Sequence, residues 1–324
     1  MTLEQLRIFL AVAQHLHFTR AATALYISQP AVSAAIQKLE DFYGLRLFHR
    51  IGRRIELTEA GVLLQKEARK VLDQVGLIER GLRELNNLQS GQLNLGSSLT
   101  IGNYWLPHLI SRFKVAYPGV RVSCSLGNND AIVDGILAGQ HDLALVEGVI
   151  QPDALQQLEQ KPFASDRLQI VVGIPHPWYD KAVVGVEELL DTAWVMREEG
   201  SGTRQRFEQA LRRWGIDPTQ LQVALVLNSG EMVKMVVENG LGATALSELM
   251  VAKELRLGSL RPVKVLPSQS VASTDPPATS LTPLSRPFLL LKHRERFQSR
   301  LSQTFEQMLW DSTQTSGSLL QLNP

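Results

Sequence analysis

The chain has 324 residues, of which 44% are hydrophobic and 20% charged, and its formal net charge is +1. These values exclude a disordered or fibrous protein and allow two or three globular domains, each with a core of its own. A single cysteine, Cys124, excludes an internal disulfide and a cysteine-based metal cluster, so we expect a reducing compartment. Without a leader sequence or an apolar run of the ~18 residues that a membrane helix needs, we predict a cytoplasmic protein.

Three short helices are predicted at the start of the chain. Thr2 and Gln5 have the spacing of a capping box, which begins the first helix. The second spans about residues 19–25, and its small alanines permit a close helix crossing. Ser28 is a good N-cap for the third helix, and Pro30 falls in its first turn, where a missing N–H is harmless. Two short helices joined by a tight turn are typical of the helix-turn-helix, a DNA-binding motif.

The third helix has one apolar face and one short, polar and uncharged face. The apolar positions are Val32, Ala35, Ile36, Leu39 and Phe42. The opposite face consists of Gln29, Pro30, Ser33, Ala34 and Gln37. Gln and Ser both donate and accept hydrogen bonds, which suits base edges in a major groove, although any amphipathic helix pair could look like this. Glu40 and Asp41 lie lower on the polar arc and would repel phosphates, so only the N-terminal half should enter a groove.

After Gly44 the apolar period changes to two, and the sequence HRIGRRI is predicted to be a β-hairpin that turns at Ile51 and Gly52. This wing would carry His49 and three arginines that could reach phosphates or a minor groove; a charged turn in solvent is the alternative. We expect a winged helix-turn-helix domain over residues 1–58. Its candidate DNA-binding residues are Arg20, Ser28, Gln29, Pro30, Ser33, Ala34, Gln37, Arg50, Arg53 and Arg54.

Thr58 can cap a helix that runs to about Gln89, so we predict a linker helix over residues 59–90. Its apolar positions keep heptad spacing for three repeats, which predicts a narrow seam that needs a partner helix. They are Leu64, Ala68, Val71, Val75, Ile78, Leu82 and Leu85. Gly76 and Gly81 weaken the helix by about 1 kcal/mol each relative to alanine, so it should depend on pairing. The simplest partner is the same helix of a second subunit, and packing on the next domain is the alternative.

From Gln92 the pattern becomes strand, helix, strand, which predicts an α/β domain with a parallel sheet over residues 91–310. The segment that begins at Asn128 is repeated at Asn228, and each copy precedes a strand. We therefore predict two lobes with a cleft between them. Lobe I covers 91–162 and about 288–310, and lobe II covers 163–266. The Pro-, Ser- and Thr-rich residues 267–287 are expected to be a flexible loop, and residues 311–324 a disordered tail.

With these elements in this order, the chain resembles the LysR-type transcriptional regulators over nearly its whole length. The segment FTRAATALYISQPAVSAAIQKLEDFYGLRLFHRIGRRIELTEAG is similar to the DNA-binding signature of that family. The resemblance implies a second domain built like a type 2 periplasmic binding protein, with a small effector in its cleft. It also implies binding to double-stranded DNA as dimers paired through the linker helix, commonly assembled into tetramers, with RNA polymerase as a candidate partner.

Three loops are most similar to the branch of the family that regulates sulfite reduction and sulfur assimilation. They are SSLTIGNYWLP at 97–107, LVEG at 145–148 and REEGSGTR at 197–204. Similar loops occur in regulators of carbon fixation, so a regulator of inorganic-carbon genes that senses a phosphorylated or carboxylate metabolite is the alternative.

The predicted cleft has the chemistry of an anion site, because hydroxyls and glycines stand at two helix starts, where exposed N–H groups and the helix dipole favour negative charge. The candidate effector-binding residues are Ser97, Ser98, Thr100, Asn128, Asn129, Glu147, Arg197, Ser201, Gly202 and Thr203. The hydroxyls could instead only cap the helices, and Arg197 or Arg204 could pair with Glu147 or Glu198. We expect a small anionic effector: sulfite, another oxyanion or a small carboxylate.

An enzymatic function has little support in the sequence. Gly200, Ser201 and Gly202 do not form the Gly-x-Ser-x-Gly elbow of hydrolases, and neither metal-ligand spacing nor a GxxxxGK phosphate loop occurs. We therefore predict no catalytic residue, no metal and no cofactor. A solute-binding protein would explain two lobes, but it would need a signal peptide and would leave residues 1–90 unexplained.

Overall fold

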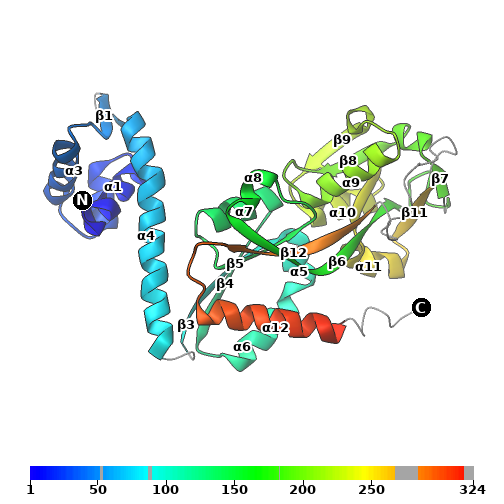
Figure 1. Cartoon of the computed structure of the whole chain (residues 1–324). Helices are drawn as coiled ribbons and strands as arrows, with labels where there is room; N and C mark the ends of the chain where they lie inside the picture. The colour runs from blue at the N-terminus through cyan, green and yellow to red at the C-terminus, as the bar shows by residue number, and fades with distance from the viewer. Residues whose placement is uncertain (52–53, 87–89, 182, 267–283, 317–324) are drawn as a thin grey trace. The chain divides into compact units, whose positions relative to one another are not determined.

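The computed structural model describes residues 1–324 except 52–53, 87–89, 182, 267–283 and 317–324. The chain forms two compact units, Met1–Arg83 and Glu84–Pro324, and each has hydrophobic cores of its own (Figure 1). None of the helices in the described ranges is both long and apolar enough to cross a membrane.

The first unit is a winged helix-turn-helix followed by a long helix. Its elements are α1 Leu3–His15, α2 Phe18–Ala24, α3 Gln29–Tyr43, β1 Phe48–Ile51, β2 Arg54–Leu57 and α4 Glu59–Asn86. The predicted capping box is confirmed, because the Thr2 hydroxyl accepts from Gln5 N at 3.2 Å while Thr2 N donates to the Gln5 side chain at 2.8 Å. β1 and β2 pair antiparallel as the predicted hairpin, and its tip lies outside the described residues.

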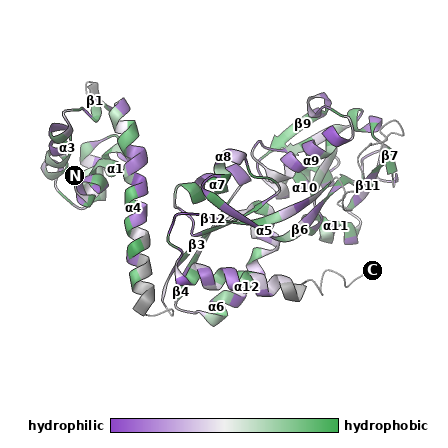
Figure 2. Ribbon diagram, in the orientation of Figure 1, coloured by the Kyte–Doolittle hydropathy of each residue, from purple (hydrophilic) through white to green (hydrophobic). Residues whose placement is uncertain are grey.

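The apolar residues of helix α4 have different surroundings along its length. Ala68 is 1% exposed and, with the half-buried Leu64, packs into the core of the winged domain around Phe9 and Leu39. Farther along, Val71, Ile78 and Leu82 are 43%, 51% and 62% exposed. Figure 2 shows apolar residues recurring among polar ones along this helix. The heptad seam is therefore partly used within the domain, and three of its later positions, Val71, Ile78 and Leu82, are open to solvent.

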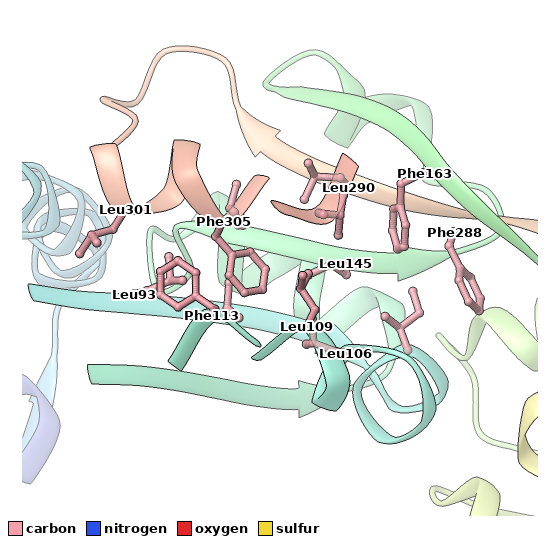
Figure 3. Close-up of a cluster of buried hydrophobic side chains, with 14 of the residues drawn as sticks. Leu93, Leu106, Leu109, Phe113, Leu145, Phe163, Phe288, Leu290, Leu301 and Phe305 are labelled. Atoms are coloured by element: carbon pink, nitrogen blue, oxygen red, sulfur yellow. The ribbon is translucent and has the colours of Figure 1, made fainter. Parts of the chain in front are cut away.

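Lobe I of the second unit contains three parallel strands covered on both faces. The predicted parallel sheet is mixed, because the next two strands of the sheet, residues 285–293 and 158–173, run antiparallel to their neighbours. The strands are β3 Gly91–Ser98, β4 Val120–Gly127 and β5 Leu143–Glu147, and β3 lies between the other two and is parallel to both, as predicted. Helices α5 Leu99–Tyr104, α6 Leu106–Ala116 and α12 Arg300–Ser316 cover one face, where Phe113 packs on Phe305 (Figure 3). Helices α7 Asn129–Leu137 and α8 Pro152–Leu155 cover the other.

Lobe II repeats this layering. Its strands are β7 Val183–Gly185, β8 Ala193–Arg197, β9 Gln222–Leu227, β10 Ala243–Ser247 and β11 Leu260–Leu266. Its helices are α9 Gly202–Arg213, α10 Gly230–Glu238 and α11 Glu248–Leu257, with short 3-10 turns at Glu187–Leu190 and Pro218–Gln220. The repeat seen in the sequence corresponds to α7 with β5 and α10 with β10, and side chains alternate along β8 between the two cores of the lobe.

Two long strands join the lobes, and we call them the crossing strands. They are β6 Leu158–Gly173 and β12 Ser285–His293, and they lie together in one sheet of order β4-β3-β5-β12-β6-β10-β8-β9. β6 pairs with β12 up to Arg167 and with β10 from Leu168. The chain therefore passes from lobe I to lobe II within the continuous strand β6, between Arg167 and Leu168, and not after Pro162 as predicted.

The structure differs from the sequence prediction at two further places. Residues 285–287, expected in the flexible loop, belong to β12, where Pro287 faces Ser165 next to a register shift. Residues 311–316, expected in the disordered tail, continue α12, and the Ser312 hydroxyl donates to the Leu309 carbonyl at 2.7 Å. In both places polar composition suggested a loop, but hydrogen bonds to neighbouring structure hold the chain. Residues 267–283 and 317–324 lie outside the described residues.

Candidate nucleic-acid interface and inter-lobe site

The start of α3 is built as the sequence predicts. The Ser28 hydroxyl accepts from Ala31 N at 3.4 Å, Pro30 lies in the first turn, and Gly44 ends the helix with φ at +64°. In the turn that precedes α3, Tyr26 has φ at +56° and a side chain that is 96% exposed. This left-handed conformation is unfavourable for a residue with a Cβ, so the tight turn between α2 and α3 is imposed by the packing of the two helices.

The predicted DNA-reading face of α3 lies on the surface, and its two glutamines form hydrogen bonds with side chains of the same helix. Gln29 Nε2 donates to Ser33 Oγ at 2.8 Å, and Gln37 Nε2 donates to Asp41 Oδ1 at 2.6 Å. Pro30 and Ala34 are exposed beside them. Gln29 and Gln37 therefore keep carbonyl oxygens and a second N–H each for a further partner.

The predicted basic residues lie on three elements. Arg20 is exposed on α2, while Arg50 and Arg54 lie in β1 and β2 of the wing. Arg53 lies outside the described residues. A hollow of about 410 Å³ opens between α3 and the wing, lined among others by Ser33, Gln37 and His49.

Two expectations for α3 are corrected. Glu40 does not face outward, because its side chain is 8% exposed and accepts from the N–H groups of Leu47 and Phe48 at 2.8 and 3.4 Å. It thereby satisfies backbone donors at the start of the wing, which a helix-arc argument on α3 alone cannot foresee. Phe42, placed on the apolar face, is 71% exposed and packs on Tyr43 at the helix end.

In the second unit, several predicted effector residues meet at the carboxyl ends of strands from both lobes. Thr100 stands in the first turn of α5, Thr203 in the first turn of α9, and Glu147 at the end of β5. All three are at most 3% exposed. Crevices of this kind, where strands end and helices begin, are the usual binding places of open α/β sheets.

The group that joins these residues is Arg286, which the sequence prediction missed. Its side chain is fully buried, and its Nη1 donates to Thr203 Oγ1 at 3.0 Å, while its Nη2 contacts Thr100 Oγ1 at 3.4 Å. Nη1 also forms an ion pair with Glu147 Oε2. One guanidinium thus contacts residues of both lobes.

Asp166, also missed, is the fixed partner of Arg286. The two residues face each other in the register of the crossing strands. Asp166 Oδ2 accepts from Arg286 Nε at 2.9 Å and from Nη2 at 2.7 Å, and Oδ1 accepts from the Ser247 hydroxyl at 2.8 Å. We call these six residues the Arg286 cluster: Thr100, Glu147, Asp166, Thr203, Ser247 and Arg286. The FLLL run directly after Arg286 and Pro287 is the one sequence signal that this segment enters the core.

The remaining predicted residues close the cleft around the cluster. Asn129 donates from Nδ2 to the Glu147 carbonyl and accepts at Oδ1 from Glu147 N at 3.3 Å. Gly202 lies so close that a Cβ there would be 2.5 Å from Asn129 Nδ2 and 2.7 Å from the Glu147 carbonyl oxygen. Asn128 Nδ2 reaches the Glu199 carbonyl at 3.3 Å. Outside this contact a hollow of about 680 Å³ is lined among others by Asn129, Asp130, Gly200, Ser201, Arg204 and Gln205.

The predicted arginine and serines occupy different surroundings. Arg197 makes two hydrogen bonds to Glu198, at 2.8 and 2.9 Å, as the alternative of a structural pair predicts. Arg204 also forms an ion pair, but with Glu208, and not with Glu147 or Glu198 as expected. Burial works to raise the pKa of Glu198, but the hydrogen bond and charge of Arg197 lower it overall. Ser98 Oγ is buried and has no hydrogen-bond partner, and the Ser97 hydroxyl donates to the Ser98 carbonyl at 3.1 Å.

A winged helix-turn-helix joined to a two-lobed α/β domain defines a DNA-binding regulator with a receptor domain for a small molecule. Two family models match the chain. The model of the bacterial regulatory helix-turn-helix protein, lysR family, matches residues 3–62, and the model of the LysR substrate binding domain matches residues 86–314. The chain belongs to the LysR family of transcriptional regulators, and it is a regulator rather than an enzyme.

Relatives and solved structures refine this assignment. A probable RuBisCO transcriptional regulator of Trichormus variabilis is 35% identical over 306 residues, which cover 94% of this chain and 87% of that protein. The regulatory domain of CcmR from Synechocystis, solved in complex with 2-PG, is 26% identical with a TM-score of 0.57, covering 68% of this chain and 97% of that chain. Full-length CbnR complexed with its target DNA shares the fold, with a TM-score of 0.67, 21% identity and coverage of 96% and 100%.

These relatives favour the carbon-fixation alternative over the sulfur branch. The three loops at 97–107, 145–148 and 197–204 had suggested sulfur assimilation. Because similar loops occur in both branches, they do not discriminate between them, whereas similarity along nearly the whole chain is to a regulator of RuBisCO genes.

Proposed function

We propose that this chain regulates genes of carbon fixation and responds to a small phosphorylated or carboxylate anion bound between its lobes. The observation that carries the proposal is the 35% identity to a probable RuBisCO transcriptional regulator over 94% of the chain. The related CcmR regulatory domain, which binds 2-PG, supports an anionic effector of this class.

The chemistry of the cleft supports an anionic ligand. Thr100 and Thr203 bring hydroxyls to the starts of α5 and α9, and Arg286 places a guanidinium between them. Arginine binds carboxylates and phosphates through paired N–H donors, and the N-terminus of a helix favours negative charge. The Ser201 side chain, 3% exposed at the N-cap of α9, makes no capping hydrogen bond and is a further donor for such a ligand.

On the DNA side, we propose that the N-terminal half of α3 enters a major groove. Gln29, Ser33 and Gln37 would contact base edges there, and Arg20 with the wing arginines would contact phosphates. The exposed seam positions Val71, Ile78 and Leu82 of α4 would pair with the same helix of a second subunit, which sets the spacing of two half-sites.

The test measures DNA binding of the full-length chain to duplexes from upstream of the RuBisCO genes in its own genome. We expect 2-phosphoglycolate to change the affinity or the footprint, by about 5-fold or more, and sulfite and sulfate to have no effect. A Gln29→Ala variant controls for specificity, because it should lose site preference and retain general binding. A response to sulfite alone, or sequence-specific binding only at sulfur-assimilation promoters, would show that the carbon-fixation proposal is wrong.

A further inference from the structure

Every nitrogen of the Arg286 guanidinium already contacts a partner. Its Nε and Nη2 donate to Asp166 Oδ2, Nη2 also contacts Thr100, and Nη1 contacts both Thr203 and Glu147. An anion that binds Arg286 in the cleft must therefore displace one of these partners.

The two carboxylates of the cluster are held very differently. Both oxygens of Asp166 accept directed hydrogen bonds, from Arg286 and from Ser247, and the backbone of Asp166 is fixed opposite Arg286 in the sheet. Glu147 Oε2 is buried and forms only an ion pair with Nη1, without a well-directed hydrogen bond. The cluster holds two carboxylates for the one Arg286 guanidinium, so Asp166 alone can remain as its counter-ion when Glu147 leaves. Glu147 is thus the partner that leaves most easily.

We propose that the Glu147 carboxylate is an internal ligand that occupies the place of the effector's anionic group. A carboxylate or phosphate of the effector replaces it on Arg286 Nη1, and the hydroxyls of Thr100 and Thr203 and the start of α9 complete the receptor. The proposal rests on the proposed function, since it concerns the same effector. It also changes the role predicted for Glu147: the residue competes with the effector for Arg286 and does not bind the effector.

This exchange also links binding to movement of the lobes. Glu147 belongs to lobe I, and its carbonyl oxygen lies against Gly202 of lobe II, where no Cβ would fit. We expect displacement of the Glu147 side chain to disturb this contact, because the side chain and the carbonyl oxygen belong to one residue. Because one anion replaces another, Arg286 keeps the same number of counter-ions throughout.

The experiment compares the full-length chain with a Glu147→Gln variant, which keeps the shape and removes the charge. The probes are inorganic phosphate and 2-phosphoglycolate, and binding is measured by calorimetry. We expect Glu147→Gln to bind both probes about tenfold more tightly or better, because a like charge beside the bound anion has gone. Glu306→Gln is the control, since Glu306 is a largely buried carboxylate that pairs with Lys292 away from the cleft.

A second substitution locates the gain. Adding Thr203→Val to Glu147→Gln removes the hydroxyl that contacts Nη1 and should cancel most of the increase in affinity. Equal or weaker binding by Glu147→Gln, while the wild type binds 2-phosphoglycolate, would overturn the internal-ligand proposal and leave the proposed function standing. Binding by Glu147→Gln alone would support the internal ligand and count against 2-phosphoglycolate as the effector. Absence of binding by both proteins would overturn both proposals.

Discussion

The carboxylate of Glu40 joins the end of α3 to the start of the wing. Its Oε1 accepts from the N–H groups of Leu47 and Phe48, and its Oε2 pairs with Arg46 at 2.9 Å. Because Leu47, Phe48 and the Glu40 side chain are buried, water does not replace the carboxylate at the two N–H groups. Glu40 therefore helps to hold the start of the wing against α3, together with the packing of Phe48 on Phe9 and Phe18.

Replacing Glu40 tests this connection. We expect Glu40→Ala to lower the free energy of unfolding of the N-terminal unit by about 1.5–3 kcal/mol, because buried donors lose a charged acceptor. Glu40→Gln should be milder, since an amide oxygen still accepts. The measurement is hydrogen exchange at the amides of Leu47 and Phe48 in the full chain, with the exposed Asp41→Asn as the control. Unchanged exchange in Glu40→Ala would show that the wing is held by its other contacts.

Residues whose partners are close in the sequence were predictable, and those with distant partners were not. Ser28 caps α3 through an N–H three residues away, so its role follows from local pattern alone. Glu40 acts on residues seven and eight positions later, and Arg286 on Asp166, 120 positions earlier. The role of a buried charged residue can be predicted only when its partner is known. Because the partner of Arg286 is distant in the sequence, the composition of its segment predicted a loop.

At the scale of elements, the heptad pattern predicted the length of α4 but not how the seam is divided. A seam records only that apolar residues share one side of a helix, and it does not say which neighbour covers each part. Ala68 is covered by the winged domain, whereas Ile78 and Leu82 remain exposed. Similarly, the change of lobe was predicted after Pro162, whereas β6 runs without a break from one lobe to the other and changes its partner strand between Arg167 and Leu168.

The exposed half of the seam gives a prediction for self-association. Ile78→Asp should weaken dimerisation of the full chain about a hundredfold, because a carboxylate would be buried in an apolar helix pair. Leu63→Asp is the control, since Leu63 is 65% exposed on the same helix but off the seam. Sedimentation equilibrium of both variants measures the effect. A dimer that tolerates Ile78→Asp would mean that another surface joins the subunits.

At the scale of the whole molecule, the helix-turn-helix and the proposed anion site belong to different units of the chain. The core of the winged domain, from Phe9 to Ala68, lies within Met1–Arg83, and the Arg286 cluster lies within Glu84–Pro324. The repeat of helix and strand in the sequence predicted two lobes, because each lobe is built from local units. Of the cluster between the lobes, Thr100, Glu147 and Thr203 were predicted from local loop chemistry, whereas Asp166, Ser247 and Arg286 lie on strands whose pairing is not visible in the sequence.

Truncation after Gln89 separates the two activities. Because the first unit has its own core and residues 1–89 carry the whole of α3 and α4, this fragment should keep preference for the same duplex. Addition of 2-phosphoglycolate should then leave binding unchanged, while it alters binding by the full chain. Fluorescence anisotropy with one labelled duplex measures both proteins. A fragment that still responded to the anion would place the effector site in the winged unit and exclude the inter-lobe cleft as the sensor.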